Sequence, residues 1–261
     1  MPITISSIYR YPVKGLSPER LSRTTLSSGR CLPEDRRFAV ALGSTRFDPA
    51  EPQWLPKRCF AMLMRDEKLA RLDTRFDAAS GELTIAEQGE IALRARITEP
   101  AGSRTVGDFL GEFLGDAVER PLRVVEAPGH AFADSRRKPE ASTGQYVSLI
   151  NLRSIAGLEE AMDTRIDPLR FRANIYFDGA PAWQEHDWIG AALAVGGARL
   201  KVIATITRCA ATEVNPATAE RDLDIVGALQ RGFAHNLMGI YAEVAAGGDI
   251  AVGDKLQLGK E

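Results

Sequence analysis

Short strand-like segments with few helical segments between them constrain this chain more than any other feature. They are rich in β-branched and aromatic residues and are bounded by Gly, Pro and Asn, as strands commonly are. A doubly wound parallel sheet would place a helix after nearly every strand. The pattern instead predicts a mixed α/β, β-rich fold in which a barrel-like β domain carries attached helices. The expected strands lie within residues 3–13, 36–43, 68–88, 120–128, 145–150, 171–177, 198–209 and 240–258.

Three helices are expected beside these strands. Residues 103–118 carry apolar side chains at helical spacing. Asn151 and Asp222 are predicted to cap the second and third helices, because each precedes a run with apolar helical periodicity. The first helix is expected to close an N-terminal β-rich domain of residues 1–120, followed by a second domain of residues 121–261.

Composition narrows the class of protein. The chain has 261 residues, of which 44% are hydrophobic and 26% charged, and its formal net charge is −2. This balance is typical of a globular protein with a large core and argues against a general binder of nucleic acid or membrane surfaces. The N-terminus shows no signal-peptide pattern, and no apolar run approaches the roughly 20 residues of a membrane span. We therefore expect a cytoplasmic protein.

The cysteines suggest neither disulfides nor a metal cluster. Cys31, Cys59 and Cys209 are odd in number and widely spaced, with no CxxC pattern. This favours a reducing compartment. The histidines are equally far apart and show no metal-binding spacing; they are His130, His186 and His235.

The segment "ATITRCAATEVNPATAERD" sets Cys209 apart from the other cysteines. Thr205, Thr207 and Cys209 would share one face at the end of a strand, before a polar loop. The neighbouring Arg208 would favour the thiolate, which is the form that binds soft metals or attacks electrophiles. The alternative is a buried cysteine acting as a small apolar side chain, which is the better interpretation of Cys59 in its apolar surroundings.

The segment "FRANIYF" offers a second candidate. If residues 171–177 alternate as a strand, Arg172, Asn174 and Tyr176 lie on one face. That face is either a polar stripe in solvent or a pocket wall, in which a guanidinium would bind a phosphate or carboxylate and an amide would orient a ligand.

In order along the chain, "YPVKG", "DRRF", "FRANI", "EHDWIG", "TRCAATEVNPAT" and "GIYAEV" with "GDIAVGDKL" resemble the MOSC-domain proteins. The whole layout is similar to the mitochondrial amidoxime-reducing component and its bacterial relatives. The resemblance implies a MOSC β-barrel domain preceded by a smaller N-terminal β-rich domain. It also implies a molybdenum cofactor (molybdopterin), whose dithiolene leaves only one metal ligand for the protein to supply.

The resemblance also assigns site residues. Cys209 aligns with the metal ligand and catalytic residue. Basic members of the set would bind the pterin phosphate by charge-assisted hydrogen bonds. The implied cofactor-binding residues are Lys14, Gly15, Arg36, Thr143, Gly144, Arg172, Asn174, Thr207, Arg208 and Cys209. Gly15 stands where the mitochondrial relatives have a serine, and "NPATA" stands where "DPxTG" is usual.

The activity implied is reduction of N-hydroxylated small molecules. A separate electron-donor protein would be needed, because the chain shows no nicotinamide, flavin or iron–sulfur signature. Two alternatives remain: a sulfur carrier using a Cys209 persulfide, and a non-catalytic protein that binds and transfers the molybdenum cofactor.

Overall fold

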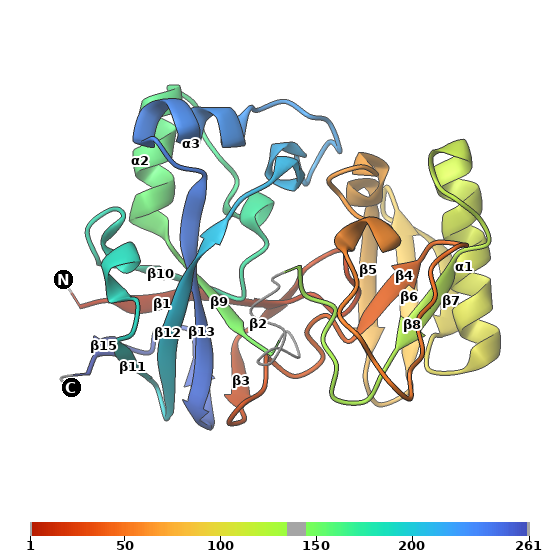
Figure 1. Ribbon diagram of the computed structural model, residues 1–261, viewed down its shortest axis with the longest axis horizontal. Helices are drawn as coiled ribbons and strands as arrows, with labels where there is room; N and C mark the ends of the chain where they lie inside the picture. The colour runs from red at the N-terminus through yellow and green to blue at the C-terminus, as the bar shows by residue number, and fades with distance from the viewer. Residues whose placement is uncertain (1, 135–144, 260–261) are drawn as a thin grey trace.

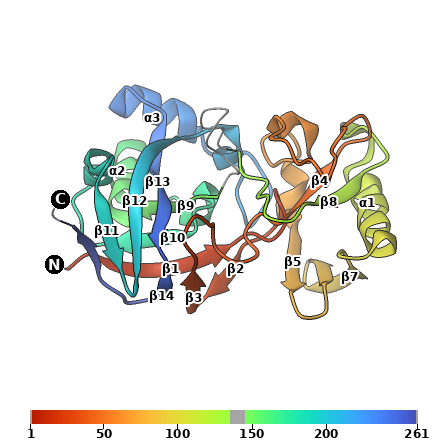
Figure 2. The ribbon, with the colours of Figure 1, turned by 60° about the horizontal axis from the view of Figure 1, so that its bottom comes forward.

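The computed structural model describes residues 2–134 and 145–259 of the chain. These residues form two lobes that lie side by side, with β1 and β2 extending from one lobe toward the other (Figures 1 and 2). We call them the N lobe, which contains α1, and the C lobe, which contains α2 and α3. The fold is β-rich and mixed α/β, as the sequence predicts.

An eight-stranded sheet builds most of the C lobe, in the order β15-β11-β12-β13-β9-β10-β1-β2. Only β9 and β10 run parallel; the other neighbours are antiparallel. A ribbon of β3 and β14 lies beside this sheet. The strands are β1 (Thr4–Arg10), β2 (Glu19–Leu21), β3 (Arg23–Leu26), β9 (Val147–Asn151), β10 (Ile175–Asp178), β11 (Ala192–Val195), β12 (Ala198–Thr207), β13 (Leu237–Ala246), β14 (Gly248–Ala251) and β15 (Leu256–Leu258).

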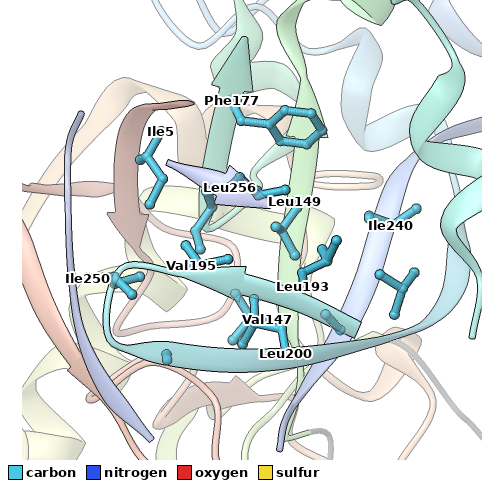
Figure 3. Packing of buried hydrophobic residues seen from close by; sticks show 14 of the residues in the cluster. Ile5, Val147, Leu149, Phe177, Leu193, Val195, Leu200, Ile240, Ile250 and Leu256 are labelled. Carbon is cyan, nitrogen blue, oxygen red and sulfur yellow. The ribbon is translucent and has the colours of Figure 1, made fainter. Parts of the chain in front are cut away.

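The C-lobe sheet curls around an apolar core. Along β12, Leu200 and Val202 are buried whereas Arg199 and Lys201 are exposed, as expected of a strand with one solvent face. Side chains from β1, β9, β10, β11, β12, β13, β14 and β15 converge on the same interior (Figure 3). Burial of this shared interior stabilises the curled sheet.

Two helices cover the C lobe. The first is α2 (Leu152–Met162), and the side chain of Asn151 caps it by accepting from the backbone N–H of Arg153, as predicted. The second is α3 (Ile225–Phe233), and the predicted cap at Asp222 is wrong. Asp224 caps α3 instead, because its carboxylate accepts from the backbone N–H of Gly227.

The N lobe contains two small sheets and one long helix. Strands β5 (Leu72–Asp77), β6 (Glu82–Glu87) and β7 (Glu90–Arg96) form one sheet, and β4 (Phe38–Ala41) pairs with β8 (Arg123–Glu126). Helix α1 (Pro100–Leu114) packs closely against β8. A Cβ atom at Gly107 would lie 2.1 Å from the carbonyl oxygen of Leu122, so a glycine permits this approach. Strand β7 was not anticipated from the sequence.

The lobes do not divide the chain exactly at residue 120. Strands β1 to β3 belong to the sequence-defined N-terminal domain, yet β1 pairs with β10 and β3 with β14 in the C lobe. Ile5, Ile8 and Leu26 accordingly belong to the C-lobe core.

The expected strand over residues 171–177 is wrong in its first half. A 3-10 helix covers Pro168–Phe171, Arg172 has a left-handed backbone with φ of 52°, and β10 begins at Ile175. Asn174 therefore lies just before the strand. Tyr176 does not share a polar face, because it is 1% exposed and packs in the core between β10 and the helices.

The C-terminal segment and the end of β12 also differ from expectation. Residues 240–258 contribute to three strands rather than two, and β12 ends at Thr207, two residues before Cys209. In the described parts of the chain, no helix is long and apolar enough to cross a membrane.

Candidate functional site

A cavity of about 840 Å³ lies between the two lobes. The N lobe contributes the segment around Lys14, Arg36 and residues 54–64, and the C lobe contributes the end of β12 and residues 170–174. The sequence-predicted residues that line it are Lys14, Gly15, Arg36, Arg172, Asn174, Thr207, Arg208 and Cys209. Thr143 and Gly144 lie outside the described residues.

Cys209 occupies a defined position at the edge of this cavity. It follows β12 in an extended conformation and immediately precedes a 3-10 helix, Ala210–Glu213. The backbone N–H and the hydroxyl of Thr212 both donate to the Cys209 carbonyl oxygen at 3.0 Å. The thiol is half-buried and free of any disulfide. These hydrogen bonds therefore fix the backbone of a residue that lines the cavity.

Arg208 is fixed by carbonyl oxygens rather than by carboxylates. Its Nε donates to Met238 O at 2.9 Å and its Nη1 donates to Phe171 O at 2.8 Å. Burial lowers the pKa of Arg208 from its usual value. Its half-buried guanidinium is thus held in place by these carbonyl oxygens, one residue before Cys209 in the chain.

Arg172 is fixed in a similar way. Its Nη2 donates to Leu16 O at 2.7 Å, and its guanidinium lies 4.4 Å from the ring centre of Tyr11. Burial lowers the pKa of Arg172 as well. Arg36 contacts both the same ring and Arg172. Its guanidinium lies 4.8 Å from the ring centre of Tyr11, and its Nη2 donates to Arg172 O at 2.9 Å.

Tyr11 remains neutral between these two arginines. Burial raises the pKa of the Tyr11 phenol to about 12, even though Arg172 and Arg36 act in the opposite direction. The hydroxyl donates to Ala173 O at 3.3 Å. Tyr11 therefore offers a ring face to two cations without neutralising either of them.

Other cations of the cavity have carboxylate partners. Lys14 contacts Asp134 and donates to Phe132 O at 3.0 Å, and burial lowers its pKa although Asp134 opposes that shift. Arg36 pairs with Asp35 at 2.5 Å. In contrast, neither Arg172 nor Arg208 pairs with a carboxylate within residues 2–134 and 145–259.

The balance of charge in the cavity is strongly positive. Seven lysine or arginine side chains line it, against the two carboxylates of Asp35 and Asp134. Burying cations without counter-charges is unfavourable, so such a surface fits an anionic ligand that completes the pairing. The overall charge of −2 conceals this local excess.

Asn174 lines the cavity, but its amide serves mainly internal contacts. Its Oδ1 accepts from the backbone N–H and hydroxyl of Ser148 at 3.1 and 2.8 Å, and its Nδ2 donates to Tyr9 O at 3.2 Å. Asn174 thereby joins β9 to β1. Thr207 is exposed at the strand end and lines the cavity beside Arg208.

Several lining residues were missed from the sequence. Trp54, Lys57 and Arg58 come from the loop that its prolines marked only as irregular. Tyr241 lies on β13, and Arg170 precedes Phe171. Arg170 could have been suspected from its place beside "FRANI", whereas Tyr241 reaches the cavity only because β13 pairs with β12.

Comparison with known proteins gives the class to which this fold and cavity belong. The MOSC domain matches residues 131–257, and the MOSC N-terminal beta barrel domain matches residues 2–117. The chain therefore belongs to the MOSC-domain proteins. The closer resemblance to amidoxime-reducing proteins remains a prediction.

Individual relatives are distant. The molybdenum cofactor sulfurase of Caenorhabditis briggsae is 25% identical over 244 residues, which cover 91% of this chain and 33% of that protein. The chain thus spans about a third of that curated relative's length. Among solved structures, the YuaD protein from Bacillus subtilis is 12% identical with a TM-score of 0.45, covering 98% of this chain and 94% of that chain. YiiM from Geobacillus stearothermophilus is 20% identical with a TM-score of 0.34, covering 44% and 54%.

Proposed function

We propose that the cavity binds a molybdenum–pterin cofactor, and that the protein reduces N-hydroxylated small molecules with electrons from a separate donor protein. One observation carries the proposal: the free thiol of Cys209 shares a cavity with the half-buried guanidinium groups of Arg172 and Arg208, which no carboxylate pairs with among the described residues. Membership in the MOSC-domain proteins, one of whose relatives is named a molybdenum cofactor sulfurase, supports it.

The residues present fit such a group. Among the described residues, no group of three or more His, Cys, Asp or Glu side chains could hold a metal by itself. A metal at Cys209 would therefore need its other ligands from an organic cofactor. A thiolate is a suitable soft ligand, and the cavity volume lies within the range of about 300–1,000 Å³ that is usual for ligand pockets.

The chain's own groups have separable roles in this proposal. When bound, the cofactor supplies a redox-active metal at which an N–O bond can be reduced. Cys209 anchors the cofactor. The guanidinium groups of Arg172 and Arg208 bind its anionic parts through charge-assisted hydrogen bonds inside the cavity. The overall change converts R–NHOH, two electrons and two protons into R–NH2 and water, and the donor protein supplies the electrons.

The test uses protein made in a host that synthesises the cofactor. Wild type should contain stoichiometric molybdenum and reduce an alkylhydroxylamine with reduced viologen but not with NADH alone. Cys209→Ser should lose metal and turnover. Cys59→Ser is the matched control, since Cys59 does not line the cavity, and it should retain both. NADH-driven turnover by the isolated wild type would contradict the separate donor, and undiminished turnover in Cys209→Ser would contradict the ligand assignment.

The name of the Caenorhabditis briggsae relative favours one second candidate, which is sulfur transfer through a Cys209 persulfide. The same purified protein distinguishes the two functions. A cyanide-labile sulfur on metal-free wild type, absent from Cys209→Ser, would support the carrier. Stoichiometric molybdenum without labile sulfur would support the reductase. Bound molybdenum without viologen-driven turnover would instead favour a cofactor-binding protein.

A further inference from the structure

Arg170 lies between the two parts of the chain that carry the thiol and a cavity guanidinium. It belongs to the 3-10 helix Pro168–Phe171, which ends directly before Arg172, and it lines the same cavity. Its side chain is only 3% exposed. The groups to which it donates belong to the loop that follows Cys209. Arg170 therefore connects the Arg172 segment with the segment that begins at the thiol.

The guanidinium of Arg170 donates to both ends of that loop. Its Nη1 donates to Glu213 O at 2.9 Å, and its Nη2 donates to both carboxylate oxygens of Asp222 at 2.6 and 2.8 Å. Glu213 ends the 3-10 helix that begins directly after Cys209. Because the guanidinium is planar and its donors are fixed relative to one another, these contacts set one position for residues 213–222.

The loop is also closed by its own hydrogen bonds. Asn215 Nδ2 donates to Asp222 Oδ2 at 2.7 Å, and the Asn215 N–H donates to Glu220 O at 2.8 Å. The Ala219 N–H donates to Asn215 O at 2.9 Å. A displacement of Asp222 would therefore move the loop as a unit.

The C-lobe core fixes the backbone from which Arg170 projects. The hydroxyl of Tyr176, a residue that is 1% exposed, donates to Pro168 O at 2.8 Å and accepts from the Ala173 N–H at 3.1 Å. The carboxylate of Asp167 accepts from the Leu169 N–H at 2.8 Å. The guanidinium of Arg170 is thus held from the core side as well as from the loop side.

Stability alone does not account for a buried arginine at this position. The Nε of Arg170 is buried and has no hydrogen-bond partner within residues 2–134 and 145–259. An unpaired buried donor opposes folding, and a buried ion pair is often no more stabilising than apolar side chains of similar volume. What the contacts of Arg170 do provide is a single geometry for the loop.

We propose that Arg170 is a positioning residue of the candidate site: it holds residues 210–222, and with them Cys209, at a fixed place relative to Arg172. The inference rests on the proposed function, in which the thiol and the Arg172 guanidinium hold the same cofactor. A group that is held from two sides is retained only while the two sides keep their spacing.

The first test uses the full chain without molybdenum, made in a host that cannot synthesise the cofactor. Arg170→Met removes the donors while keeping a long side chain. Asp222→Ala removes their acceptor, and because Asp222 is 35% exposed this variant should fold even if the first does not. In both variants, amide hydrogen exchange at Asn215 and Ala219 should become about tenfold faster or more, since a hydrogen bond to a charged group is lost.

The matched control is Arg231→Met, which makes the same change in an exposed ion pair. Arg231 and Asp224 are 69% and 59% exposed, and neither lines the cavity. Exchange at Asn215 and Ala219 in this variant should remain as in wild type.

The second test uses protein from a host that makes the cofactor. Molybdenum per chain after gel filtration should fall in Arg170→Met and Asp222→Ala but not in Arg231→Met. Arg170→Lys keeps the charge as a point donor, which cannot reproduce the planar set of contacts. It should therefore recover the thermal unfolding midpoint more fully than the molybdenum content. A purely structural role predicts instead that molybdenum content follows the unfolding midpoint in every variant.

The outcomes separate this proposal from the proposed function. Exchange as in wild type at Asn215 and Ala219 in both Arg170→Met and Asp222→Ala would overturn the positioning role. Molybdenum content that equals that of wild type in both variants, or that simply follows the unfolding midpoints, would overturn it while leaving the proposed function. Faster exchange in the variants, together with a wild type that never contains molybdenum, would overturn the proposed function and leave Arg170 as the residue that holds the loop.

Discussion

Arg36 and Arg172 share an uncommon backbone conformation and a common partner. Both have positive φ, 51° and 52°, which is rare for residues other than glycine and asparagine. Both guanidinium groups lie over the ring of Tyr11. Local strain persists where surrounding contacts over-determine it, and such positions cluster at ligand sites. The two arginines are thus positioned by the folded lobes before a ligand arrives.

Arg172→Ala should weaken cofactor retention, whereas Arg165→Ala should not. A hydrogen bond to a charged group contributes roughly 1.5–3 kcal/mol, which corresponds to about tenfold or more in affinity. Arg165 is the matched control because its side chain is 94% exposed and pairs with Glu159 on the surface. Molybdenum per chain after gel filtration is the measurement, with thermal unfolding to confirm that both variants fold. Equal molybdenum content would contradict the assignment of Arg172.

Residue types at the site were predictable from the sequence, but their geometry was not. Residue alternation placed Arg172 and Asn174 on a strand, whereas the structure places them in the irregular segment before it. Nothing in the local sequence indicates φ of 52° at an arginine, because distant contacts with Leu16 and Tyr11 fix it. The place of Cys209 in the wall of the cavity agrees with its local signal, which is a neighbouring arginine and a polar loop just after a strand, whereas its role as metal ligand stays a prediction.

Elements with local signals were predicted well. Asn151 caps α2 and Gly81 turns the β5–β6 hairpin, since each position depends on its immediate neighbours. Asp222 and Asp224 illustrate the limit of prediction from local sequence. Both precede an apolar helical run, and only the fold determines that Asp222 binds Arg170 while Asp224 caps α3. The ion pair between Arg170 and Asp222 also connects the 3-10 helix Pro168–Phe171 to the loop after Cys209.

A buried acid in the 3-10 helix Gln184–Trp188 packs against the start of α2 and has a measurable effect on stability. Glu185 is fully buried and accepts from the hydroxyl of Ser154 at 2.7 and 2.9 Å and from Asn151 Nδ2 at 3.2 Å. Burial raises the pKa of Glu185 above its ordinary value of 4.5, although these hydrogen bonds oppose the shift. The folded protein therefore binds this proton more tightly than the unfolded chain.

Glu185→Gln should flatten the dependence of stability on pH. In wild type, the contribution of the Glu185 proton is fully present below pH 4.5 and is lost as pH rises through the higher folded-state pKa. Each unit of pKa difference corresponds to about 1.4 kcal/mol. Urea unfolding between pH 4.5 and 7.5 gives the two curves. A difference between wild type and variant that stays constant over this range would contradict the raised pKa.

At the scale of the whole molecule, the loop after Cys209 joins the two lobes. Val214 packs in the N-lobe core although its neighbours in sequence belong to the C lobe. Arg221 adds polar contacts: it donates to Ala210 O at 2.9 Å and, across the lobe boundary, to Met64 O at 2.8 Å. It also lies 3.3 Å from a carboxylate oxygen of Glu67. The position of the thiol therefore depends on contacts between the lobes.

Arg221→Ala should loosen this junction. We expect the free energy of unfolding to fall by roughly 1–2 kcal/mol, since several charge-assisted hydrogen bonds are lost and the side chain is only partly buried. Amide hydrogen exchange should become faster in residues 61–69 and 209–214. Arg231→Ala is the matched control, because Arg231 pairs with Asp224 within the C lobe. Unchanged exchange at the junction in Arg221→Ala would show that apolar contacts alone hold the lobes.

The pairing of β1 with β10 has a consequence for how the chain folds during synthesis. Thr4 pairs with Asp178, about two thirds of the chain later. The N-lobe sheet β5-β6-β7, in contrast, is built from neighbours in sequence. Contacts so distant in sequence form slowly, because a long loop must close before they stabilise anything. On the ribosome, β2 can pair with one edge of β1 early, but the edge that pairs with β10 must stay open while the N-lobe meander forms. That edge is exposed to chaperones and to wrong partners until β10 is translated.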